Sequence, residues 1–139
     1  MRYITREDLI ETIQGRLIDE SVSEAPEEIL DGLESKAIDF AISYISGRYN
    51  TEVIFGDPIL RSGLLVQAIA MIVVYRAVRR NAARKVPDDF PDIYSEAIKI
   101  LSNIQTGAQS LPGLPEITGE TGTPGSLMYG NTTNKDFFI

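Results

Sequence analysis

Four arginines are the residues of this 139-residue sequence whose spacing is best suited to binding chemistry. Arg76, Arg79, Arg80 and Arg84 stand at positions i, i+3, i+4 and i+8, which places them along one face of a helix. Such a face can contact DNA phosphates, pair with an acidic surface of a neighbouring subunit, or serve solubility and match the helix dipole. A net charge of −7 and a pI near 4.6 argue against a free DNA-binding domain, because these domains are usually basic overall.

Residues for enzyme chemistry are few. The chain has no Cys and no His, which removes thiol chemistry, the usual zinc sites and the side chain most used for proton transfer near neutral pH. The pairs Glu27/Glu28 and Asp88/Asp89 remain as acid–base candidates, but acids beside a Pro typically occupy the first turn of a helix. No glycine-rich phosphate loop or nucleophile elbow is found. We therefore expect no catalytic residue, no metal ion, no cofactor and no enzyme activity.

Helices must position these side chains, and the first half of the chain predicts two. Thr5 can cap a helix from Arg6 to Gln14, and the acidic stretch 19–28 is predicted to be a loop. Pro26 suits the first turn of a second helix, which should end near a left-handed Gly47. The inward stripe of this second helix is predicted to comprise Leu30, Leu33, Ala37, Phe40, Ala41, Tyr44 and Ile45. The residues predicted to fall largely on its other side are Asp31, Glu34, Lys36 and Asp39.

The second half predicts a central helix. Residues 50–55 are expected to form a connector with at most a short strand, after which Asp57 caps and Pro58 opens a third helix that runs to about Ala83. Its middle is apolar on nearly all sides, which is typical of the most buried helix of a domain. The apolar run 63–75 has about thirteen residues, against roughly twenty needed to cross a bilayer, and no secretion signal opens the sequence. We therefore expect no contact with membranes.

A fourth helix is predicted from Asp92 to Gln105, with Gly107 as its C-terminal cap. Its inward residues should be Ile93, Tyr94, Ala97, Ile98, Leu101 and Ile104. The sequence thus predicts an all-α fold: a small four-helix domain over residues 1–111, with a long central apolar helix and an extended C-terminal tail.

The tail, residues 112–139, has 5 Gly, 3 Pro and 5 Thr in 28 positions. With this composition it cannot bury enough apolar surface to form a core of its own. It nevertheless carries hydrophobic side chains that more often mark a docking site than an accident. The alternative is a tail that folds back onto its own domain. The predicted docking residues are Leu127, Met128, Tyr129, Phe137, Phe138 and Ile139.

Charge is distributed unevenly. Residues 1–57 hold 13 acidic and 5 basic side chains, whereas residues 58–111 hold 4 acidic and 7 basic ones. In a head-to-tail ring the two contacting surfaces of one protomer differ, so they can carry opposite charge. The charge distribution is therefore compatible with a ring of identical subunits.

The order of these features resembles the small head–tail connector proteins of tailed bacteriophages (adaptor or head-completion proteins), in particular the Mu-like branch. The resemblance covers residues 1–111 in the stretches "MRYITREDL", "ISYISGRY", "VYRAVRRN" and "YSEAIKILSNIQTGAQSL". The acidic stretch 19–28 and the residues after Pro112 do not align with that pattern. The positions that carry the resemblance are Tyr3, Leu9, Gly47, Arg48, Tyr49, Arg76, Tyr94, Ala97, Leu101, Ile104 and Gly107.

This resemblance implies a structural virion protein of the neck region, assembled in the cytoplasm of a host bacterium. It implies a homo-oligomeric ring, commonly of twelve copies, below the portal protein, which continues the DNA channel and joins the capsid to tail or stopper proteins. Packaged DNA would pass through the lumen without sequence specificity. Arg76, Arg79, Arg80 and Arg84 would then contact a neighbouring subunit or the DNA channel. The alternative is a small helical DNA-binding or regulatory domain that uses the same arginines.

Overall fold

The computed structural model describes residues 1–13, 15–80 and 90–117 of the chain, and of Arg16 and Phe90 the backbone only. These residues form six helices: α1 (Arg6–Thr12), α2 (Gly15–Ser21), α3 (Pro26–Ile45), α4 (Thr51–Ile54), α5 (Gly63–Arg79) and α6 (Phe90–Thr106). No strand occurs among them, so the predicted all-α class is confirmed. The three long helices, α3, α5 and α6, are the predicted second, third and fourth helices, and α2 and α4 are additional to the predicted four.

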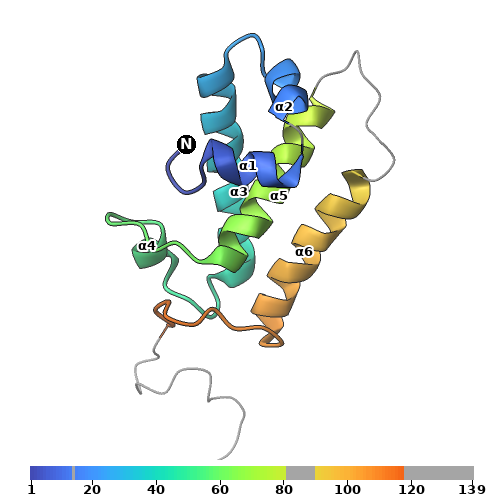
Figure 1. Cartoon of the computed structure of the whole chain (residues 1–139). Coiled ribbons are helices and arrows are strands. Elements are labelled where there is room, and N and C mark those ends of the chain that lie inside the picture. The colour runs from blue at the N-terminus through green and yellow to red at the C-terminus, as the bar shows by residue number, and fades with distance from the viewer. Residues whose placement is uncertain (14, 81–89, 118–139) are drawn as a thin grey trace, which may run out of the picture.

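Helix α5 is the centre of the molecule (Figure 1), as its sequence predicts. It packs against α1, α2, α3 and α6, and α3 also packs against α6. Ten of its seventeen residues are buried, because a helix that is covered from several directions needs apolar side chains on most of its circumference. These residues are Leu65, Ala68, Ile69, Ala70, Met71, Ile72, Val73, Val74, Ala77 and Val78.

Helix α2 was not predicted, and it shortens the expected acidic loop. Helix α1 ends at Thr12, followed by Ile13 in an extended conformation, and the first three residues of the predicted loop 19–28 belong to α2. Burial of Ile18 and Val22, both 1% exposed, explains this helix. Because α2 packs against α5, the apolar positions supply the stability that the acidic composition of the stretch does not indicate.

Two predicted boundaries around residues 50–62 are wrong. The expected connector is the short helix α4, capped by the Asn50 side chain, which accepts a hydrogen bond from the Val53 amide at 3.3 Å. The central helix begins at Gly63 after Ser62, and Asp57 and Pro58 lie before it in an irregular segment. The structure holds that segment through contacts with the N-terminal residues, which are distant in sequence.

The helix ends are partly as predicted. Gly107 follows α6 with a φ of +93°, in the left-handed region, so its role as a C-terminal cap is confirmed. Gly47 is not among the described glycines with positive φ, which are Gly107 and Gly113. Helix α3 ends instead through Ser46 in a right-handed helical conformation, whose amide donates to the carbonyl of Ile42.

The first residues of the predicted tail lie on the helical body. The Asn50 amide donates to the Pro115 carbonyl, and the Ile117 amide donates to the Arg48 carbonyl, both at 2.9 Å. Leu111 is only 2% exposed. The described residues 112–117 are therefore attached to the segment between α3 and α4, and residues 118–139 lie outside the described part of the chain.

Candidate functional site

The N-terminal residues are fixed to α3 by a buried carboxylate, that of Glu34. One Glu34 oxygen accepts a hydrogen bond from the Arg2 amide at 2.8 Å. The other accepts from the amides of Tyr3 and Ile4 at 2.7 and 2.8 Å. The prediction that Glu34 faces water is wrong, since the residue is 3% exposed. Three backbone donors replace the water that a carboxylate otherwise binds, which makes its burial tolerable.

Tyr3 carries this attachment on to the start of α5. Its hydroxyl donates to the Leu60 carbonyl and accepts from the Ser62 amide, both at 3.1 Å. The centre of its ring lies 4.8 Å from the centre of the Phe55 ring. Burial raises the pKa of the Tyr3 hydroxyl above its usual value. These bonds hold the backbone before Gly63 in a non-helical path, which gives a physical reason for the late start of α5.

Asp8 and Arg61 form a second link between the N-terminal region and the start of α5. One Asp8 oxygen accepts from the Thr5 amide at 2.7 Å and from the Arg61 guanidinium at 2.7 Å. The same guanidinium donates to the Tyr3 carbonyl at 3.1 Å. Thr5 and Asp8 also complete a capping box at the start of α1, which confirms Thr5 as the predicted cap. This arrangement fixes the orientation of α1 across α5.

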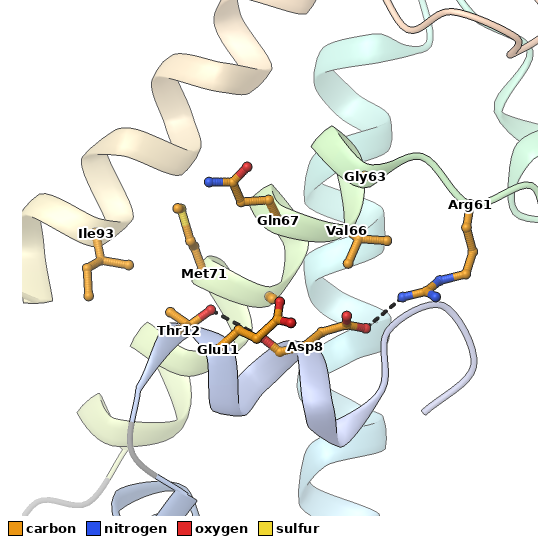
Figure 2. A pocket seen from close by; sticks show the side chains of 10 residues that line it. Asp8, Glu11, Thr12, Arg61, Gly63, Val66, Gln67, Met71 and Ile93 are labelled. Carbon is orange, nitrogen blue, oxygen red and sulfur yellow. Dashed lines mark hydrogen bonds and ion pairs between the residues drawn. The ribbon is translucent and has the colours of Figure 1, made fainter.

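A cleft of about 580 Å³ opens between α1, the first half of α5 and the first turn of α6. Figure 2 shows Glu11 projecting from α1 toward α5, with Met71 and Gln67 on α5 and Ile93 on α6 around the same space. Val66, Ala70, Met71 and Ile93 supply apolar surface, and Asp8, Glu11, Thr12, Arg61 and Gln67 supply polar groups.

Within the described residues the Glu11 carboxylate makes no hydrogen bond or ion pair, whereas the Asp8 carboxylate is paired with Arg61. A cleft with an apolar floor and one unpaired carboxylate at its rim is suited to an apolar side chain that lies near a cation. No group of three or more acidic side chains in the described part of the chain is placed to hold a metal ion. The cleft thus has the chemistry of a binding surface.

The predicted arginine face is divided by the structure. The guanidinium of Arg76 lies 5.3 Å from the centre of the Phe40 ring, and that of Arg79 lies 6.0 Å from the centre of the Tyr75 ring. Arg80 turns toward the end of α2, where it donates to the Ser21 carbonyl at 3.2 Å. It also lies 3.7 Å from the Glu24 carboxylate. Arg84 lies outside the described residues.

Arg76 and Arg79 border a cluster of half-buried aromatic rings that joins α3, α5 and α6. The Tyr75 and Tyr94 rings stack with 4.6 Å between their centres, and Phe40 lies 5.3 Å from Tyr44 and 6.5 Å from Tyr94. A guanidinium held over an aromatic face keeps its N–H groups available at the edge. The two arginines can therefore donate to carboxylate or phosphate oxygens while they keep their ring contacts.

Arg48 and Tyr49, two positions of the resemblance, organise the exit of the C-terminal segment. The Arg48 guanidinium donates to the carbonyls of Ile104 and Gln109 at 2.7 and 3.1 Å, so it satisfies the end of α6. The buried Tyr49 hydroxyl accepts from the Leu111 amide at 2.7 Å. From the sequence, both residues were identified only as positions that carry the family resemblance. The feature that could have indicated their role is an Arg followed by an aromatic residue just after the end of a helix.

The six predicted docking residues of the tail, Leu127, Met128, Tyr129, Phe137, Phe138 and Ile139, all lie outside the described residues.

Comparison with protein-family models, with curated proteins and with solved structures finds no match for this chain. None of the described helices combines the length and hydropathy that crossing a bilayer requires.

Proposed function

We propose that this protein is a structural component of a phage neck, a head–tail connector that forms a ring below the portal protein and continues the DNA channel. The observation that carries the proposal is the Arg48–Tyr49 anchor. It fixes the end of α6 and residues 111–117 to the body by side-chain and backbone hydrogen bonds. A helical body that holds its C-terminal segment as far as Ile117, with 22 further residues beyond it, suits an assembly that ties neighbouring components together.

The charge distribution supports head-to-tail contact between copies. Arg76 and Arg79 gather near the C-terminal end of α5, and exposed acids occupy the first turn of α3 at Glu27 and Glu28. Both groups lie at the end of the body where Arg80 approaches Glu24, and exposed acids and bases of one protomer can pair with their opposites on the next in a closed ring. In this arrangement the first function of the arginines is subunit contact, and DNA passes through the lumen without being read.

The rival function is a small DNA-binding or regulatory domain that uses the same two arginines, of which Arg76 is half-buried and Arg79 exposed. The net charge of −7 weighs against it, because acidic proteins repel the phosphate backbone. Under the connector proposal, DNA binding should be weak and lost at moderate salt.

Assembly mass is the measurement that tests the proposal. The purified protein should form a ring, alone at high concentration or after mixing with the portal protein of the same phage, in native mass spectrometry and electron microscopy. Reversing the exposed Arg79 to Glu should abolish the ring while circular dichroism shows a folded monomer. Normal assembly of this variant together with loss of a salt-sensitive affinity for DNA would favour the rival function.

A further inference from the structure

We propose that the cleft between α1, α5 and α6 binds the segment Lys135–Phe138 of a second copy of this chain. The inference rests on the self-association contained in the proposed function, and it is independent of a phage role. It assigns an occupant to a surface for which the proposed function names none.

The cleft selects for an apolar group with a neighbouring cation. Val66, Ala70 and Met71 of α5 and Ile93 of α6 form its apolar lining. Met71 is well suited to receive an aromatic ring, because its thioether is flexible and makes favourable contacts with ring edges. At the α1 rim the exposed Glu11 carboxylate has no partner among the described residues, so it can pair with an incoming cation without breaking an existing contact.

The stretch Lys135-Asp136-Phe137-Phe138 carries that combination. In an extended segment, alternate side chains point to the same side, so Lys135 and Phe137 lie about 7 Å apart on one face. This pairing matches a carboxylate at the rim and an apolar floor behind it. The other hydrophobic group of the tail, 127–129, has no basic residue within five positions. Charge complementarity therefore favours the later segment.

Chain length permits the contact. Seventeen residues separate Ile117 from Lys135, and this linker spans up to about 60 Å when extended. A body of this size has a radius of gyration of about 13 Å, which corresponds to a diameter of about 35 Å. The linker is thus long enough to reach the cleft of an adjoining protomer.

The choice of a second copy rests on the self-association in the proposed function, because a linker of about 60 Å also spans the distance to the cleft of its own chain. The exit at Ile117 is bonded to Arg48, which caps the C-terminal end of α6, whereas Ile93 of the cleft lies in the first turn of α6. These two ends are separated by roughly 17 Å along the helix axis. A donor surface and an acceptor surface at different ends of one protomer are the arrangement that a head-to-tail contact uses.

The direct test uses a fluorescent synthetic peptide of residues 127–139, titrated into the full-length Phe137→Ala/Phe138→Ala protein, whose own segment competes poorly. We expect saturable binding, weakened about fivefold or more when Glu11→Lys is added. A peptide with Lys135→Glu should bind the Glu11→Lys protein with an affinity within about twofold of that between the unchanged peptide and the protein that retains Glu11. The matched control is Glu96→Lys, an exposed acid of α6 outside the cleft, which should leave binding unchanged. Absence of peptide binding, or an equal loss of peptide affinity in Glu11→Lys and Glu96→Lys, would overturn the inference.

Mixing full-length variants separates a second copy from the same chain. Glu11→Lys has an impaired cleft and an intact segment, and Phe137→Ala/Phe138→Ala has the reverse. Each alone should be mostly monomeric in sedimentation velocity, and their mixture should form a heterodimer. Peptide binding without heterodimer formation would mean that the segment occupies the cleft of its own chain, which contradicts the inference. A ring that forms normally from both variants would refute the inference and leave the connector proposal standing.

Discussion

The buried Glu34 carboxylate offers the sharpest test of the structure, because three backbone donors from a distant segment converge on it. Glu34→Gln keeps the shape of the side chain and replaces one acceptor oxygen by an NH2 group. That group cannot accept, so at least one amide among Arg2, Tyr3 and Ile4 is left without a partner. An unsatisfied buried donor costs about 1–3 kcal/mol.

The bonds that survive in Glu34→Gln are also weaker, because their acceptor is neutral. Hydrogen bonds to charged groups contribute about 1.5–3 kcal/mol, against about 0.5–1.5 for neutral ones, so each loses about 1 kcal/mol. The expected loss in the free energy of unfolding is about 3–5 kcal/mol, from a total of about 5–15 for a domain. A loss of this size should lower the midpoint urea concentration of unfolding strongly.

Urea unfolding followed by far-ultraviolet circular dichroism measures this loss, and hydrogen exchange of the Arg2, Tyr3 and Ile4 amides locates it. The control is Asp39→Asn, since Asp39 is an exposed acid on the same helix and should change stability by no more than about 0.5 kcal/mol. A loss below about 1 kcal/mol for Glu34→Gln, or unchanged protection of the three amides, would refute the argument that Glu34 holds the N-terminal segment.

Three further predictions concern other parts of the molecule. Tyr49→Phe removes the acceptor of the buried Leu111 amide, so the free energy of unfolding should fall by about 1–3 kcal/mol, with faster hydrogen exchange at Leu111. Because burial raises the pKa of Tyr3, the folded protein keeps a proton that the unfolded chain loses, and stability should fall as pH rises above about 10. The difference in phenolate absorbance between the wild type and Tyr3→Phe should show an ionisation above the usual pKa of tyrosine, and an ionisation at that usual pKa would contradict this. Deleting residues 118–139 should leave helical content and melting temperature nearly unchanged while weakening assembly, and an unfolded product would show that the segment belongs to the core.

Four of the six described helices could be predicted from the sequence, whereas α2 and α4 could not. The nearly continuous apolar character around Ile69 predicts a central helix, and α5 is that helix. Gly107 marks the end of α6, since a left-handed residue after a helical pattern is a local requirement that glycine meets. These features depend on periodicity and backbone preference within one turn or two, and such information is contained in neighbouring residues.

The roles of polar side chains were decided by tertiary structure. Glu34 stands among water-facing positions of α3, yet it is buried because the N-terminal residues bring three amides to it. Asp57 and Pro58 have the residue types of a helix start, but Tyr3 binds the backbone at Leu60 and Ser62 and delays α5 to Gly63. Whether a polar group is buried depends on donors and acceptors supplied from about thirty to sixty residues away, and no local pattern encodes their arrival.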